Sequence, residues 1–251
     1  MAIVDLLPDL FRAGKMYVEA KEVFKSNKTE EEKLRQIKKI DKHWHGSSGF
    51  PLKTYGPIKA IGVCIALVDM SKFYIELREP DEALRCLEDV SETLSNIVVT
   101  LPPTGQNIRH FNTAHTNNVW AQLYMGKAYG QRVVNGISSR YVFDSLHHST
   151  SCCERASSFA RMMAESNPSI SLYQDLYDDT ITFSYRLYKY LQESLMVKKS
   201  ENDILDFMND VTNSYMRDLL SKDFEQLFVS LLEKDPGNSR IETYLNSILT
   251  F

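Results

Sequence analysis

The sequence predicts an all-α protein, and three observations lead to this fold class. First, the 251 residues include only 10 glycines and 8 prolines, which leaves few turns and favours long helices. Second, apolar residues recur every three or four positions along most of the chain, which is the spacing of one helix face. Third, capping boxes such as the one from Thr29 to Glu32 mark places where helices begin. We therefore expect about ten helices and no strand.

The boundaries of these helices follow from the same patterns and from the turn-forming segments between them. Clusters of glycine, serine and proline predict loops at 45–57 and 99–113, and a polar, weakly periodic segment at 133–150 separates two later helices. The expected helices span about 5–26, 29–43, 58–77, 80–98, 114–132, 151–166, 168–195, 200–219, 224–232 and 239–251.

The length of the chain fits one all-α domain covering 1–251, because a chain of this size can bury a large core without disulfides or metals. Within it we distinguish N-terminal helices and a loop at 1–57, a core of paired helices at 58–168, and C-terminal helices at 169–251. The helices on either side of Arg78-Glu79-Pro80-Asp81 continue the same apolar period, so they are expected to form an antiparallel pair.

Charge and cysteine content exclude several classes of function. The net charge is −4, with acidic and basic residues spread along the chain, so a nucleic-acid partner or an anionic membrane is not expected. No run of about 18 apolar residues could span a bilayer, and the N-terminus does not resemble a signal peptide. Four cysteines without paired spacing favour a reducing compartment. We expect an intracellular protein, either cytoplasmic or nuclear.

The two best helical pairs share a pattern. In the first, a tyrosine follows a hydrophobic–small pair and precedes an alanine by nine residues; in the second, Met125-Gly126, Tyr129 and Asn167-Pro168 repeat the main features. This pattern resembles the tetratricopeptide repeat over about 64–98 and 119–168. The aligned residues are Met70, Ser71, Tyr74, Ala83, Leu87 and Val90 in the first pair and Met125, Gly126, Tyr129, Ala156, Ala160 and Met163 in the second.

The pattern departs from the family in its spacing. In the second unit Tyr129 and Ala156 are 27 positions apart in place of nine, and the two units begin about 55 residues apart, where the family period is about 34. The expected fold is therefore an irregular, tetratricopeptide-like array of stacked antiparallel hairpins. An ordinary helical hairpin with tight packing would need the same small residues, so that interpretation remains open.

The resemblance implies a function in binding another protein. In the repeat family, the first helices of successive pairs line a concave groove that holds a peptide or a partner helix. The positions that would face this groove are Ile65, Val68, Lys72, Trp120, Leu123 and Lys127. A mostly apolar groove with two lysines suits an amphipathic helix or extended segment carrying a few acidic residues. Trp120 could equally be a core residue. The expected function is a non-catalytic adaptor or complex subunit, with the segment at 133–150 gating the groove.

Two other classes of function remain as alternatives. Asp175, Asp178 and Asp179 share one helix face, and the segment from Asn209 to Arg217 is similar to the second metal motif of terpene cyclases, which would suit a magnesium-dependent isoprenoid-synthase-like enzyme. Arg217, however, stands where that motif has a glutamate. The other alternative is a self-assembling helical coat or nucleocapsid-type protein, so a homo-oligomer is also left open.

The remaining motifs do not combine into a catalytic site. The run from His147 to Cys153 contains imidazole and thiol groups, but its spacing matches no usual zinc pattern. No glycine-rich phosphate loop and no nucleophile elbow occurs in the sequence. We therefore predict no catalytic residue, no metal site and no cofactor.

Overall fold

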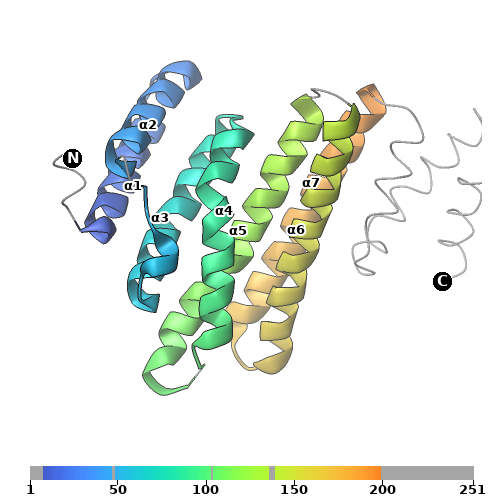
Figure 1. The fold of residues 1–251 in the computed structure, drawn as a ribbon. Coiled ribbons are helices and arrows are strands. Elements are labelled where there is room, and N and C mark those ends of the chain that lie inside the picture. The colour runs from blue at the N-terminus through green and yellow to red at the C-terminus, as the bar shows by residue number, and fades with distance from the viewer. Residues whose placement is uncertain (1–7, 47–48, 103, 136–138, 199–251) are drawn as a thin grey trace, which may run out of the picture. The chain divides into compact units, whose positions relative to one another are not determined.

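The computed structural model describes residues 8–46, 49–102, 104–135 and 139–198. These residues form seven α-helices and two short 3₁₀ turns, and no strand occurs among them, which confirms the all-α prediction for this part of the chain (Figure 1). The last three predicted helices, beyond residue 199, lie outside the described residues. The α-helices are α1 (Asp9–Lys25), α2 (Glu30–His45), α3 (Pro57–Glu76), α4 (Pro80–Thr100), α5 (Ile108–Asn135), α6 (Ser139–Ser166) and α7 (Ser171–Lys198).

Contacts divide the chain into two compact units, Met1–Gln131 and Arg132–Phe251. In the first unit α1 packs against both α2 and α3, and α3 packs against α4; in the second, α6 packs against α7. That the whole chain forms a single domain stays a prediction.

The start of α2 follows directly from its sequence. The Thr29 side chain accepts a hydrogen bond from the Glu32 backbone N–H at 3.3 Å, and the Glu32 carboxylate accepts one from the Thr29 N–H, also at 3.3 Å. This reciprocal pair is the predicted capping box, which satisfies two backbone donors that a helix leaves unpaired.

The end of α2 is held by a buried arginine from α1. Arg12 is 1% exposed, and its Nε donates to the Trp44 carbonyl oxygen at 3.0 Å, while its Nη2 donates to the carbonyl oxygen of His45. The last carbonyl groups of a helix have no partner within the helix, so this guanidinium satisfies them. It thereby ties α1 to the C-terminal end of α2.

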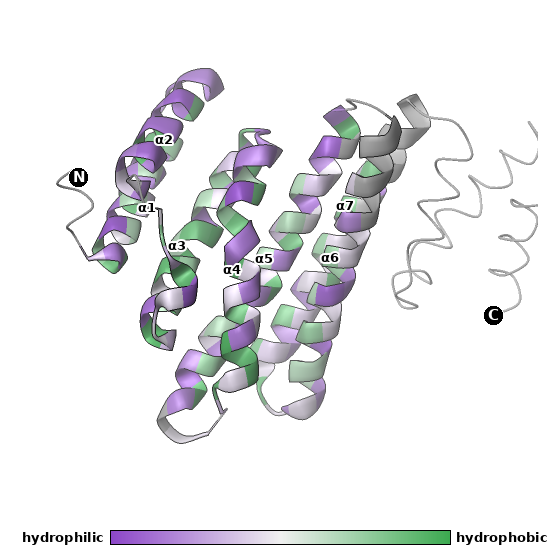
Figure 2. Ribbon diagram, in the orientation of Figure 1, coloured by the Kyte–Doolittle hydropathy of each residue, from purple (hydrophilic) through white to green (hydrophobic). Residues whose placement is uncertain are grey.

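Helix α3 lies at the centre of the first unit. Most of its side chains are buried, and Figure 2 shows it largely in the hydrophobic colour, whereas α2 is mainly hydrophilic. A three-residue connection, with Arg78 at φ 60°, joins α3 to α4, and Pro80 occupies the first turn of α4, where a missing N–H costs nothing. Ser71 and Ala83, the small residues predicted at this helix contact, are both 0% exposed.

Helices α5 and α6 correct two of the predicted boundaries. We expected a loop to run to residue 113, but α5 begins at Ile108. The segment 133–150 was expected to be a polar insertion, but α5 continues to Asn135 and α6 begins at Ser139. The long spacing between Tyr129 and Ala156 therefore arises from two helices of 28 residues each. No gating loop exists at 139–150, because those residues are helical.

Small side chains explain why the start of α6 is helical despite its polar sequence. Ser145, Ser149, Cys152, Ala156 and Ala160 follow one another at three- and four-residue intervals, and all five are buried. Serine and cysteine thus continue the buried face that alanine provides further along the helix. A search for large apolar residues does not detect such a face.

Candidate functional site

The predicted groove residues lie on α3 and α5, but they do not all face the same way. Val68 is 4% exposed and Leu123 is fully buried, so both contribute to packing in the core. Ile65 and Trp120 are half-buried and pack against the core with part of their surface exposed. Lys72 is exposed and Lys127 is half-buried. The predicted surface is thereby reduced to Ile65, Lys72, Trp120 and Lys127. Partner binding at that surface stays a prediction.

Further residues extend this surface along both helices, at positions four, seven and eleven residues after Ile65 on α3 and after Trp120 on α5. On α3 the stripe from Ile65 continues through Asp69 to Lys72, and on α5 the stripe from Trp120 continues through Tyr124. The two stripes end at Glu76 and Gln131, and the Gln131 side-chain amide donates to the Ile75 carbonyl oxygen at 2.8 Å. This bond connects the C-terminal part of α3 to α5 within the first unit.

Electrostatic interactions connect three helices on this face. Burial raises the pKa of Asp69, while the nearby cations Lys72 and Lys21 oppose that rise. Burial and the negative charges of Asp69 and Glu76 raise the pKa of Tyr124 to about 12. Lys21 belongs to α1, Asp69 to α3 and Tyr124 to α5, so helices far apart in the sequence contribute to one charged surface. The sequence analysis identified the lysine on α3 but missed Asp69 and Tyr124.

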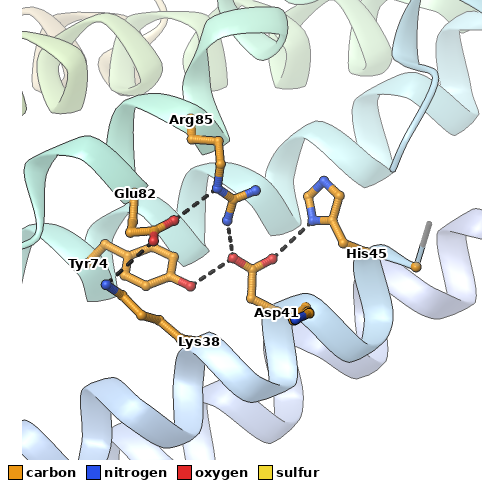
Figure 3. A pocket seen from close by; sticks show the side chains of 8 residues that line it. Lys38, Asp41, His45, Tyr74, Glu82 and Arg85 are labelled. Atoms are coloured by element: carbon orange, nitrogen blue, oxygen red, sulfur yellow. Dashed lines mark hydrogen bonds and ion pairs between the residues drawn. The ribbon is translucent and has the colours of Figure 1, made fainter. Parts of the chain in front are cut away.

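A second cluster of polar residues surrounds Asp41 (Figure 3). Asp41 lies on α2 and is only 2% exposed. Its carboxylate accepts a hydrogen bond from the Tyr74 hydroxyl of α3 at 2.7 Å, one from the Arg85 guanidinium of α4, and one from His45 Nδ1 at 3.0 Å. Arg85 also donates to Glu82 at 2.9 Å. One carboxylate therefore connects three helices.

The protonation states in this cluster follow from its contacts. Burial raises the pKa of Asp41, but the hydrogen bond from His45, the positive charge of Arg85 and the Tyr74 hydroxyl together outweigh it and hold the pKa below its ordinary value. An ionised carboxylate can only accept hydrogen bonds, so the proton of a neutral His45 ring lies on Nδ1. Burial, followed by the charge of Asp41, raises the pKa of Tyr74, which therefore stays protonated at neutral pH.

An open cavity of about 390 Å³ adjoins this cluster, lined by Lys38, Asp41, Lys42, His45, Gly46, Tyr74, Glu82 and Arg85. An aspartate that orients a histidine is one part of a nucleophilic catalytic site, but the described lining residues include no serine, threonine or cysteine to act as nucleophile. The arrangement instead stabilises the contact between α2 and the α3–α4 pair. Lys38 reinforces that contact through ion pairs with Glu79 at 2.9 Å and Glu82 at 3.4 Å.

Sequence reasoning missed this cluster, although a signal was present. Leu34, Ile37, Asp41 and Trp44 recur at three- and four-residue intervals, so Asp41 occupies an apolar position of α2. A carboxylate at such a position needs a buried partner, because an unpaired buried charge is strongly unfavourable. Tyr74 was identified as a residue of the repeat pattern, but not as a hydrogen-bond donor to Asp41.

The candidate magnesium residues of the enzyme alternative and the cysteines of the His147–Cys153 run are not gathered into a metal-binding geometry among the described residues. Asp175, Asp178 and Asp179 are all exposed on α7, and the segment from Asn209 to Arg217 lies outside the described residues. Cys152 and Cys153 are buried in α6, where burial raises the pKa of the Cys152 thiol. In the part of the chain that the structure describes, no three histidine, cysteine or carboxylate groups lie close enough together to hold a metal ion.

In comparisons with protein-family models, curated proteins and solved structures, nothing matches this chain. None of the helices described here contains a segment both long and apolar enough to cross a bilayer. Function must therefore be inferred from the residues and contacts alone.

Proposed function

We propose that this chain is a non-catalytic adaptor or complex subunit, which binds a segment of another protein on the face shared by α1, α3 and α5. The observation that carries the proposal is that α1 packs against α3 and that Gln131 of α5 donates a hydrogen bond to the Ile75 carbonyl oxygen of α3, because these contacts bring the three helices together. In a repeat array, the first helices of successive hairpins share a face in this way.

The contacts between helices support a tetratricopeptide-like array of stacked hairpins. Asp9 pairs with Lys59 at 2.7 Å, and the charge of Lys21 acts on Asp69. Partner positions therefore increase along both helices, as expected if α1 and α3 run parallel. The ion pairs of Lys38 with Glu79 and of Asp41 with Arg85 indicate in the same way that α2 and α4 run parallel. Between α4 and α5 the order is reversed, as expected for an antiparallel neighbour: Asn118 donates to Ser95 at 3.1 Å, and Gln122 donates to Ser91.

The chemistry of this face indicates the kind of partner. Ile65 and Trp120 offer partly exposed apolar surface, while Lys72 and Lys127 add positive charge beside it. An amphipathic helix or extended segment with a few acidic residues would complement both features. All four cysteines are free thiols and buried, which agrees with a protein that works in a reducing, intracellular compartment.

Charge reversal on this face is the test. In the double variant Lys72→Glu/Lys127→Glu, we expect capture of the partner in an affinity pull-down, quantified by mass spectrometry, to fall by at least about tenfold, because acidic residues of the partner would be repelled. The matched control is Lys189→Glu, since Lys189 is an exposed lysine on α7. Helicity and melting temperature should stay near those of the unmodified protein.

The result would contradict the proposal if the double variant and the control retained the same proteins in the same amounts. Self-assembly, the main alternative, is examined by light scattering over a concentration series. The molar mass of an adaptor should stay constant over the series, whereas the molar mass of coat-type assemblies should increase with protein concentration.

A further inference from the structure

After its acidic first turn of Glu30, Glu31 and Glu32, helix α2 carries a concentration of positive charge that differs from the chain as a whole. From Lys33 to Lys42 the sequence has five lysine and arginine residues and one carboxylate, although the net charge of the whole chain is −4. That carboxylate is Asp41, which is buried and already accepts hydrogen bonds from Tyr74, Arg85 and His45. It cannot also neutralise the exposed cations of α2.

Three of these cations have no counterion in the described structure. Lys38 pairs with Glu79 and Glu82, and Lys33 lies over the Phe24 ring. Arg35, Lys39 and Lys42, in contrast, are exposed and form no hydrogen bond or ion pair with any described residue. Their spacing of four and then three residues aligns them along one side of the helix. We call these three residues the α2 basic stripe.

A cavity lies beside this stripe. Its volume is about 760 Å³, and it opens between α1 and α2. Half-buried Ile40 supplies apolar surface, and Gln36 supplies a polar amide. Glu19 supplies a carboxylate, which already accepts a hydrogen bond from Trp44 Nε1 at 2.9 Å. The lining residues are Glu19, Arg35, Gln36, Lys39, Ile40 and His43.

We propose that the α2 basic stripe and this cavity form a second docking surface, which binds an acidic segment of a partner protein. Carboxylates one helical turn apart would pair with Arg35 and Lys39, and an apolar side chain would enter the cavity against Ile40. The surface lies on α2 and includes Glu19 of α1, but it shares no residue with the face proposed for α1, α3 and α5 and does not depend on the function proposed for that face.

The number and placement of the charges favour an acidic protein segment over a nucleic acid. Nucleic-acid binding draws much of its affinity from contacts between cations and phosphates, and a protein that binds DNA strongly can make roughly six to ten of them. The α2 basic stripe has three, and the negative net charge of the whole chain would oppose a long polyanion. A short acidic segment needs only two or three ion pairs and gains further from the apolar contact.

The experiment uses fluorescein-labelled amphipathic peptides of about 15 residues, with glutamates at four-residue intervals beside a leucine stripe, and measures anisotropy with the full chain. We expect binding that weakens from about 50 to 200 mM salt and is lost when glutamine replaces glutamate in the peptide. The double variant Arg35→Gln/Lys39→Gln should lower affinity by at least about tenfold, because it removes both ion-pair partners. Arg35→Lys, which keeps the charge, should retain most of the binding.

Several results would overturn the proposal. One is equal affinity of the unmodified protein and the double variant, provided that both have the same melting temperature. A second is the failure of every acidic peptide to bind the unmodified protein. A third is tighter binding of single-stranded DNA, or of vesicles containing phosphatidylserine, through Arg35 and Lys39, because the surface would then recognise polyanions in general. Lys189→Gln serves as the control for a loss of positive charge elsewhere.

Discussion

At the residue scale, Asp41 is a polar group that joins three helices of the first unit. Its carboxylate is buried, and it connects α2 to Tyr74 on α3 and to Arg85 on α4. A buried charge is tolerated only when it is paired and hydrogen-bonded, so the contacts of Asp41 depend on one another. Removing the charge should weaken the contact between α2 and the other two helices.

We predict that Asp41→Asn destabilises the protein by about 1–3 kcal/mol at neutral pH, because Arg85 and Tyr74 lose a charged acceptor. Tyr74→Phe removes one donor and leaves the carboxylate with its other two, so it should cost less, about 1 kcal/mol. Urea unfolding followed by circular dichroism measures both changes in the free energy of unfolding. Equal stability of Asp41→Asn and the unmodified protein would contradict this role for Asp41.

The same variants give a pH dependence with a defined sign. The pKa of Asp41 in the folded protein lies below its ordinary value of about 4, so folding favours the ionised form. Its contribution to stability is present above the unfolded pKa and is lost as the pH falls through the folded pKa. The stability difference between the unmodified protein and Asp41→Asn should therefore shrink below about pH 4. A difference that grows on acidification would show that the sign is wrong.

The residues of this cluster also show what sequence reasoning could and could not detect. Tyr74 was identified from its place in the repeat pattern, and in the structure it is 0% exposed. Asp41 was missed because its partners lie 33 and 44 positions away in the sequence. A single sequence indicates that an acidic residue occupies an apolar position, but it does not indicate which donors reach it.

At the element scale, local signals identified most of the helices. The capping box of α2 and the proline at the start of α4 act within a few residues, so the sequence could specify them directly. The prediction failed for 139–150, because serine and histidine have low helix propensity. Burial of Ser145 and Ser149 against neighbouring structure outweighs that propensity, and such tertiary contacts cannot be recognised from local patterns.

Two glycines inside helices provide a matched pair of tests. A Cβ atom added to Gly14 in α1 would meet nothing within 4 Å, whereas one added to Gly62 in α3 would lie 2.5 Å from Leu10 Cδ1. We predict that Gly14→Ala stabilises the protein by about 0.5–1 kcal/mol, since alanine loses less backbone entropy than glycine in a helix. Gly62→Ala should stabilise the protein less, because the Leu10 side chain must move to make room for the added methyl group. Urea unfolding of both variants measures the difference, and a larger gain at Gly62 would contradict the packing described for α1 and α3.

At the scale of the first unit, the account depends on one arrangement: α1, α3 and α5 contribute side chains to a common face. The sequence suggested this arrangement through the resemblance of two segments to a repeat, and it named lysines on α3 and α5. The contribution of α1 was not predicted. Helix α1 packs against α3, with the rings of Tyr17 and Phe73 stacked, although the two helices are far apart in the sequence, and no local pattern indicates such a contact.

The most direct measurement of this arrangement is the pKa of Asp69, obtained by NMR titration of its side-chain carboxyl group. In the unmodified protein we expect a pKa above the ordinary value, because burial disfavours the charged form. Replacing Lys21 by methionine removes a nearby cation and should raise the pKa of Asp69 further, whereas Lys25→Met, an exposed lysine of the same helix, should leave it unchanged. If Lys21→Met left the pKa of Asp69 unchanged, the charge of Lys21 would not act on Asp69, and the charged surface proposed across α1 and α3 would lose its basis.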